Sequence, residues 1–192
     1  MLVLCSRCSA KVIGDVDIPE ESRGVPDDLS IIQIGSTGKY KDRKFEIVGR
    51  VRIQMKDDFR SLWCAVYDGD KLLWICQSLE SIAFADDTFK NFPPNSDVDL
   101  RAGGKVIFGD SVKLKVIFVG QCELIHYEGE IARFPAVDKD FALVHAVNQR
   151  GNTVIIVTSA GIMEKTELLW GVTRQIEEHL FENTRIIDGW QR

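Results

Sequence analysis

The chain has little of what marks fibrous, disordered or membrane-spanning proteins. Its 192 residues include only 15 glycines and 5 prolines, which excludes a low-complexity or collagen-like chain. No apolar run approaches the roughly 20 residues that an α-helix needs to cross a bilayer. A basic excess is also missing, because 24 lysines and arginines stand against 29 acidic residues, a net charge of −5. This balance argues against a protein built mainly to bind nucleic-acid phosphates.

What the chain does contain is typical of a soluble globular protein. Hydrophobic residues make up 45% of it and charged residues 28%. The stretch from Met1 to Cys8 is too short for the apolar region of a signal peptide, and no cleavage site follows it. We therefore expect a cytoplasmic protein of one or two domains.

The five cysteines are an odd number, which favours reduced thiols over a disulfide framework. Cys64, Cys76 and Cys122 each lie in or directly after an apolar stretch. Free cysteine is among the most buried residue types, so these three are predicted to act as small buried hydrophobes.

Cys5 and Cys8 form a C-x-x-C motif, which is half of a zinc ribbon, because this spacing lets both sulfurs face one tetrahedral ion. A closed structural site needs four ligands, and no second C-x-x-C or C-x-x-H motif is present. A second copy of the chain, or a distant His or Cys, would have to complete the site. The alternative is a degenerate remnant or the start of a strand. Zinc at Cys5 and Cys8 is the one cofactor that the sequence suggests.

The pattern along the chain predicts an exposed arm and linker over residues 1–28, followed by two β-rich halves, 29–104 and 105–192. In the first half, residues 45–53 alternate between apolar and polar types, with Val48 the one exception, which is typical of a strand with one buried face. The sequence Asp68-Gly69-Asp70 between two apolar runs predicts a hairpin.

The second half repeats the order of the first: a long strand, an apolar strand, a glycine-containing turn and another apolar strand. This order suggests a tandem duplication, although any meandering β-protein shows similar spacing. Residues 173–182 have apolar positions four apart and predict one short C-terminal helix. The predicted fold is all-β, with two small antiparallel sheets or barrel-like halves and that helix.

Several short motifs follow one another in a recognisable order: Gly35-Ser36, Tyr40, Phe45-Glu46-Ile47-Val48-Gly49-Arg50, Trp63 ahead of an acid-Gly turn, Leu73-Trp74 after it, and Tyr127-Glu128-Gly129-Glu130-Ile131. Together they resemble a bacterial family catalogued as domain of unknown function 4178, over about residues 29–182. Members of that family often carry a zinc-ribbon-like segment ahead of this domain, which would make Cys5 and Cys8 a reduced form of it. The resemblance implies a fold and a bacterial source, and it implies no activity.

His126, Glu128 and Glu130 alternate along one predicted strand, so that an uninterrupted strand would point all three to one face. Neighbouring side chains of this kind lie roughly 6.7 Å apart, close enough for two of them to converge on a cation. Imidazole and carboxylate ligands suit zinc, manganese or iron, and the two glutamates could serve as acid and base in hydrolysis. The alternative is a polar sheet face in water.

His145 lies in an apolar stretch and is interpreted as a hydrogen-bonded core or sheet histidine.

The densest basic region runs from Lys39 to Arg52 and would be the place to bind a phosphate backbone. The net negative charge favours a solvated hairpin tip and sheet edge instead, so nucleic acid is not expected as a partner. Trp170 and Trp190, near the end of the chain, could dock a protein partner or cover the mouth of a barrel-like half. The leading hypothesis is a non-catalytic binding or scaffold module of a bacterial cytoplasmic system with a protein partner. The rival hypotheses are a metal-dependent, hydrolase-like enzyme at His126, Glu128 and Glu130, and a nucleic-acid accessory factor.

Overall fold

The computed structural model of this chain describes residues 2–4, 11–13, 30–56, 59–77, 81–85, 89–91, 93, 96–109, 112–131, 134–135, 141–159, 162–175 and 181–185. In chain order the strands are β1 (Leu2–Leu4), β2 (Lys11–Ile13), β3 (Thr37–Tyr40), β4 (Arg43–Met55), β5 (Phe59–Tyr67), β6 (Lys71–Gln77), β7 (Ser81–Ala85), β8 (Lys90–Asn91), β9 (Ser96–Val98), β10 (Lys105–Phe108), β11 (Val112–Ile131), β12 (Phe141–Val147), β13 (Asn152–Ser159), β14 (Ile162–Gln175) and β15 (Phe181–Glu182). Every described element is a strand, which confirms the all-β prediction. Among these residues there is no helix with the length and apolar character needed to cross a membrane.

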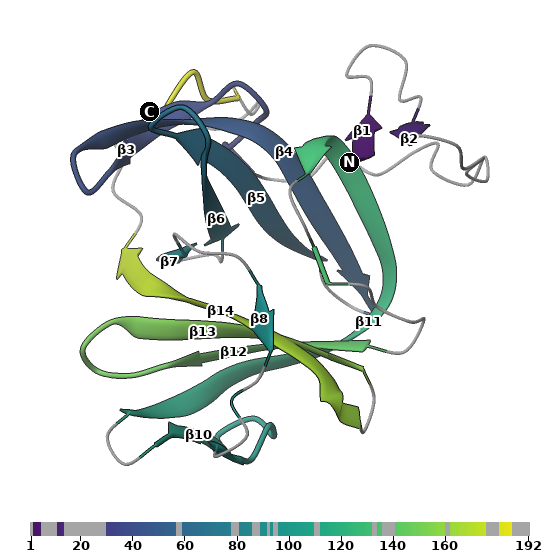
Figure 1. Ribbon diagram of the computed structural model, residues 1–192, viewed down its shortest axis with the longest axis vertical. Helices are drawn as coiled ribbons and strands as arrows, with labels where there is room; N and C mark the ends of the chain where they lie inside the picture. The colour runs from purple at the N-terminus through teal and green to yellow at the C-terminus, as the bar shows by residue number, and fades with distance from the viewer. Residues whose placement is uncertain are drawn as a thin grey trace.

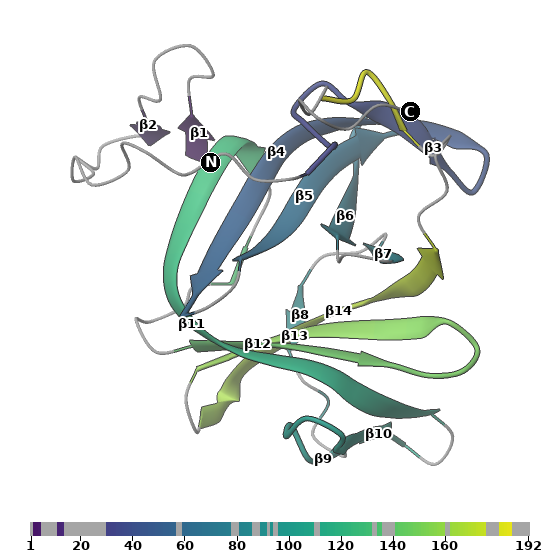
Figure 2. The same ribbon diagram turned by 180° about the vertical axis from the view of Figure 1, so that it is seen from behind.

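Eight of the strands close into a ring. Strands β4 to β7 pair in succession as antiparallel neighbours, and β11 to β14 do the same. The pairing of β7 with β14 joins the two sets on one side, and the pairing of β4 with β11 joins them on the other. Figures 1 and 2 show the first set above the second, with the long β11 rising from the lower set to lie beside β4. The two halves are therefore not separate small sheets, as the sequence suggested, but parts of one 15-stranded sheet.

Apolar side chains fill the ring and cover two of its outer faces. The inner core consists of Val51, Ile53, Met55, Leu62, Cys64, Trp74, Cys76, Ala83, Ala85, Phe89, Cys122, Ile131, Phe141, Leu143, Ile155, Val157 and Leu169. The first outer cluster consists of Ile32, Tyr40, Phe45, Ile47, Trp63, Ala65, Tyr67, Leu73, Ile75, Ile82, Phe84 and Phe181. The second consists of Val106, Leu114, Val116, Val144, Ala146, Val154, Ile156 and Leu168. Because each fully buried Leu, Ile or Phe contributes about 1.5–3 kcal/mol, these three clusters hold the sheet together.

Val48 breaks the alternation of β4 for a structural reason. The register between β4 and β5 shifts between Ile47 and Gly49, which is the signature of a β-bulge. Before the shift, Ile47 packs in the first outer cluster, whereas Val51 after it lies in the inner core. The strand thus keeps its period of two and exchanges its faces at Val48.

The predicted hairpin at Asp68 and Gly69 is confirmed: both residues have positive φ angles, 49° and 90°, and they join β5 to β6. The predicted helix over residues 173–182 is wrong in its described part. Thr173 and its neighbours up to Gln175 belong to β14, Phe181 and Glu182 form β15, and residues 176–180 lie outside the described residues. The end of β14 pairs with β7 and closes the ring. The hydrogen bonds between these strands override the local helical spacing of the sequence.

Candidate functional site

A cavity of about 160 Å³ opens between strands of both halves of the ring. Its lining residues are Arg60, Cys76, Gln77, Ile117, Phe118, Leu143, His145 and Ile155. They come from β5, β6, β11, β12 and β13, so the site exists only because the ring brings distant segments together. An apolar cavity of about 150 Å³ is large enough to bind benzene, so this one can hold a small organic molecule.

Arg60 supplies the positive charge of this cavity. It pairs with Ile53 across the β4–β5 ladder, and directly opposite residues point to the same face, so Arg60 is directed inward like Ile53. Its guanidinium carbon lies 4.3 Å from the centre of the Phe118 ring, in cation–π distance. Burial is the main cause of the shifted pKa values of His145 and Cys76; the charge of Arg60 adds to the lowering of the pKa of His145 and opposes the rise in the pKa of Cys76. The guanidinium therefore acts on the polar groups of the cavity.

His145 is held in a defined, uncharged form. Burial, helped by the charge of Arg60, lowers the pKa of His145 to about 4, so the ring is neutral at pH 7. Its Nε2 lies 2.6 Å from Oγ1 of Thr153, and this hydroxyl donates its single proton to the carbonyl oxygen of Ala146 at 3.2 Å. The tautomer protonated at Nε2 satisfies both contacts, because Nε2 then donates to Thr153 while the hydroxyl donates to Ala146; in this tautomer Nδ1 is the unprotonated nitrogen. The prediction of a hydrogen-bonded core histidine is confirmed, and the histidine also lines the cavity.

Cys76 and Cys122 of the ring are neutral thiols rather than nucleophiles. Cys64, Cys76 and Cys122 are buried and free of disulfides, as the sequence predicted. Burial raises the pKa of Cys76 to about 11 and that of Cys122 to about 12. Since the thiolate is the reactive form, neither thiol is activated at neutral pH.

His126, Glu128 and Glu130 lie on β11, and two of them face cations. His126 is opposite Arg52 and Glu128 is opposite Arg50 in the β4–β11 ladder. Among the described residues, no group of three or more His, Cys, Asp or Glu side chains could hold a metal ion. Neighbouring guanidinium groups oppose cation binding. The structure thus gives no geometric support to the hydrolase-like metal site.

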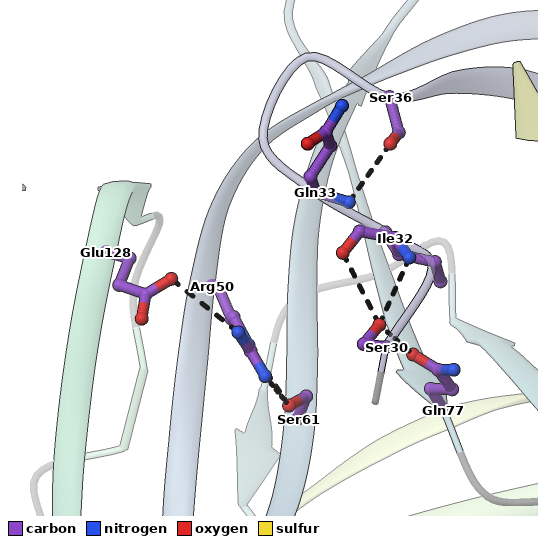
Figure 3. Close-up of polar contacts among 8 residues, drawn as sticks. All are labelled: Ser30, Ile32, Gln33, Ser36, Arg50, Ser61, Gln77 and Glu128. Atoms are coloured by element: carbon purple, nitrogen blue, oxygen red, sulfur yellow. Dashed lines mark hydrogen bonds and ion pairs between the residues drawn. The ribbon is translucent and has the colours of Figure 1, made fainter. Parts of the chain in front are cut away.

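Glu128 instead faces the buried Arg50 (Figure 3). Oε2 of Glu128 lies 3.7 Å from Nη1 of Arg50, and Arg50 donates two hydrogen bonds to Oγ of Ser61, at 3.1 and 2.7 Å. The Arg50 guanidinium also lies 4.5 Å from the centre of the Trp63 ring. Burial lowers the pKa of Arg50 to about 10, and the charge of Glu128 opposes that shift. These contacts tie β11, β4 and β5 together where the ring closes.

The substitution Glu128→Gln tests how much this ion pair contributes. The Glu128 side chain is 37% exposed, so water screens its charge, and we expect the free energy of unfolding to fall by less than about 1 kcal/mol. Urea unfolding of the two proteins measures the difference. A loss above about 2 kcal/mol would show that the pair behaves as a fully buried one.

The basic region from Lys39 to Arg52 does not form one exposed strip. Lys39 and Lys44 are exposed and lie opposite each other in the β3–β4 ladder, on a groove of about 500 Å³. Arg50 and Arg52, by contrast, are each only 2% exposed. The register shift at Val48 turns them toward the face that carries the first outer cluster. The surface available to a phosphate backbone is therefore shorter than the sequence suggested.

The remaining predicted site residues divide between core and undescribed positions. Trp170 is half-buried and packs edge-on against Phe108, with ring centres 5.2 Å apart, beside the second outer cluster. Trp190 lies outside the described residues, as do Cys5 and Cys8. The zinc prediction at the two cysteines therefore stays a prediction.

Sequence reasoning missed Arg60 and Gln77. Arg60 has the same strand phase as Leu62 and Cys64, so the period of two along 60–64 would have placed this charge on an inward face. Gln77 follows Cys76 at the end of β6, and its Oε1 accepts a hydrogen bond of 2.6 Å from Oγ of Ser30. No sequence signal indicated that Gln77 would reach the cavity.

Comparison with known proteins adds no relative. Neither a protein-family model, nor a curated protein, nor a solved structure gives a significant match to this chain.

Proposed function

We propose that this chain is a non-catalytic binding module that holds a small molecule in the cavity beside Arg60. The observation that carries the proposal is the cavity itself, about 160 Å³ in size and lined by strands from both halves. Its polar groups suit recognition better than reaction. Cys76 keeps its proton at neutral pH, and Nε2 of His145 is committed to Thr153.

We further propose the setting that the sequence suggested: a bacterial cytoplasmic system in which the module acts as a scaffold for a protein partner. The order of short motifs from Gly35-Ser36 to Ile131 supports a divergent member of the family of domain of unknown function 4178. The buried, reduced state of Cys64, Cys76 and Cys122 is consistent with a reducing compartment.

We also propose that the ring arose by tandem duplication. Two backbone contacts recur at corresponding places: the N–H of Gly35 and the carbonyl of Ile47 at 2.8 Å, and the N–H of Gly103 and the carbonyl of Val116 at 2.9 Å. A register shift follows at once in both halves, after Ile47 and after Val116. Such irregularities are specific features of a strand, so their repetition supports common descent of the halves.

The duplication gives the cavity a reference for comparison. Ala65 pairs with Ile47 and Ala146 pairs with Val116, so these two alanines occupy corresponding positions. Their partners on the next strands are followed by Trp74 in the first half and by Ile155 in the second, so Trp74 corresponds to Ile155. Trp74 is fully buried and packs edge-on against Phe89, with ring centres 5.6 Å apart. The first half fills this position with an indole, whereas the second half has the smaller Ile155 and a cavity.

The substitution Ile155→Trp tests the proposed function by copying the first half. We expect the indole to occupy the cavity at a cost below about 2 kcal/mol, and to abolish the binding of benzene-sized molecules. Titration of the ¹⁵N-labelled protein with benzene should shift the amide resonances of Leu143 and Phe118 in the natural chain only. The matched control is Ile155→Leu, which conserves volume and should bind as the natural chain does. Equal shifts in the Ile155→Trp protein would refute the cavity as the binding site.

A further inference from the structure

We infer that the ligand of this cavity is a small organic anion with an apolar body and a hydrogen-bond donor, as in a hydroxylated aromatic carboxylate. The inference rests on the proposed function and names the chemical class that the same cavity recognises. Three sets of groups carry it: the cation of Arg60, the acceptor nitrogen of His145, and the apolar walls between them.

The negative charge of the ligand is matched to Arg60. A guanidinium is planar and holds its N–H donors in a fixed fork, a geometry that fits a carboxylate with two parallel hydrogen bonds. It is positioned by the Phe118 ring, with 4.3 Å between the guanidinium carbon and the ring centre. Gln77 lies at the edge of the cavity, and its Oε1 accepts a hydrogen bond from Ser30 (Figure 3).

The hydrogen-bond donor of the ligand is matched to His145. With the hydroxyl of Thr153 donating to Ala146, it accepts from Nε2 of the histidine. Nδ1 is then the basic nitrogen, and it has no hydrogen bond within the described part of the chain. The His145 residue is 8% exposed. His145 lines the cavity, so an acceptor nitrogen at this position favours a ligand that donates a hydrogen bond.

The body of the ligand is limited by the apolar walls. Leu143, Ile155 and Phe118 line the cavity, and Ile117 is 52% exposed beside them. A volume of about 160 Å³ accommodates one six-membered ring. A single aromatic or branched aliphatic group therefore fits, and a nucleotide or a longer chain does not.

Three related molecules separate the contributions of charge and donor. The probe is 3-hydroxybenzoate; benzoate lacks the hydroxyl donor and phenol lacks the anionic group. We expect 3-hydroxybenzoate to bind about tenfold more tightly than either, since one hydrogen bond or ion pair inside the cavity contributes about that factor. Amide shifts of Phe118, Leu143 and Ile155 report binding to the full-length chain.

Two variants then assign the contributions to residues. Arg60→Met removes the charge and keeps the length of the side chain, so 3-hydroxybenzoate should lose its tenfold advantage over phenol. His145→Gln keeps a donor for Thr153 and removes the ring acceptor, so the advantage over benzoate should disappear. The amide spectrum of each variant verifies that the fold is retained.

The outcomes distinguish this inference from the function on which it rests. If phenol binds as tightly as 3-hydroxybenzoate and neither variant changes the order, the ligand class is refuted while the cavity remains a binding site. If none of the three molecules, nor benzene, shifts the lining amides, the proposed function fails and this inference fails with it.

Discussion

Replacing Gly171 by alanine is expected to destabilise the protein by about 3 kcal/mol, the upper part of the range for overpacking a filled site. Gly171 lies where β14 passes from β13 toward β7. A methyl group at this position would overlap the carbonyl oxygen of Phe84, which belongs to the backbone of β7 and cannot turn aside. Relief of the overlap requires β7 to move away from β14, and this ladder is one of the two that close the ring.

The other closing ladder contains a comparable position. A methyl group on Gly49 would overlap the carbonyl oxygen of Glu130, next to the point where Gly49 pairs with Gly129. Gly49→Ala should therefore cause a loss similar to that of Gly171→Ala. A glycine on each closing ladder lets the two halves approach more closely than side chains would allow.

Gly103→Ala is the matched control for both substitutions. Gly103 has a φ angle of 81°, but a methyl group there would meet no other atom within 4 Å. Alanine at this position has only the cost of a left-handed conformation, about 1 kcal/mol. Urea unfolding of the three variants measures these losses. Equal losses in Gly171→Ala and Gly103→Ala would contradict the importance of close approach at the closure.

Local sequence patterns predicted individual strands and turns, but they did not predict the pairings that close the ring. Alternation in 45–53 gave β4 and even marked Val48, the residue at which the register shifts. Asp68-Gly69 gave the turn between β5 and β6 because its cause, a positive φ angle, is local. The pairing of β4 with β11 joins residues more than 60 positions apart, and no period in either strand specifies that partner. The ring could therefore not be predicted from the sequence.

The same distinction explains the candidate site. The burial of Cys76 and His145 could be predicted from their apolar neighbours, and both predictions are confirmed. Their convergence with Arg60 depends on the packing of β5, β6 and β12 around one interior, which is a property of the closed ring. Residues 173–175 show the opposite error, since a local helical spacing was overridden by pairing with β7.

The burial of Arg50 and Arg52 was also beyond the sequence pattern. Their alternation with apolar residues correctly placed them on the face of β4 opposite to Val51. A face opposite to a core is usually solvated, but here segments from other parts of the chain cover it, and both residues are only 2% exposed. Arg50 is accommodated by Ser61 and Glu128, contacts that the sequence could not reveal.

The stability of the protein is expected to fall by about 3 kcal/mol between pH 6.5 and pH 4 because of His145 alone. Burial lowers the pKa of this histidine in the folded protein from 6.5 to about 4. Between these two values the unfolded chain binds a proton that the folded chain excludes, so acid favours unfolding. His145 therefore leaves the free energy of unfolding unchanged above pH 6.5. It lowers that free energy as the pH falls from 6.5 toward 4, and it causes no further change below pH 4.

The variant His145→Gln isolates this contribution. Glutamine has an amide N–H that can donate to Thr153 but no group that titrates in this range. All other titratable groups are the same in both proteins, so the difference between the two curves of unfolding free energy against pH belongs to His145. Urea unfolding at intervals from pH 7.5 to pH 4 should show the natural chain losing stability more steeply than the variant. Parallel curves would mean that His145 takes up its proton without unfolding, and thus that Nδ1 meets water or an acid rather than a dry cavity wall.

The same curves measured with 3-hydroxybenzoate bound connect stability to recognition. A ligand that donates to Nδ1 must lose that hydrogen bond when the histidine is protonated, so its stabilising effect should weaken as the pH approaches 4.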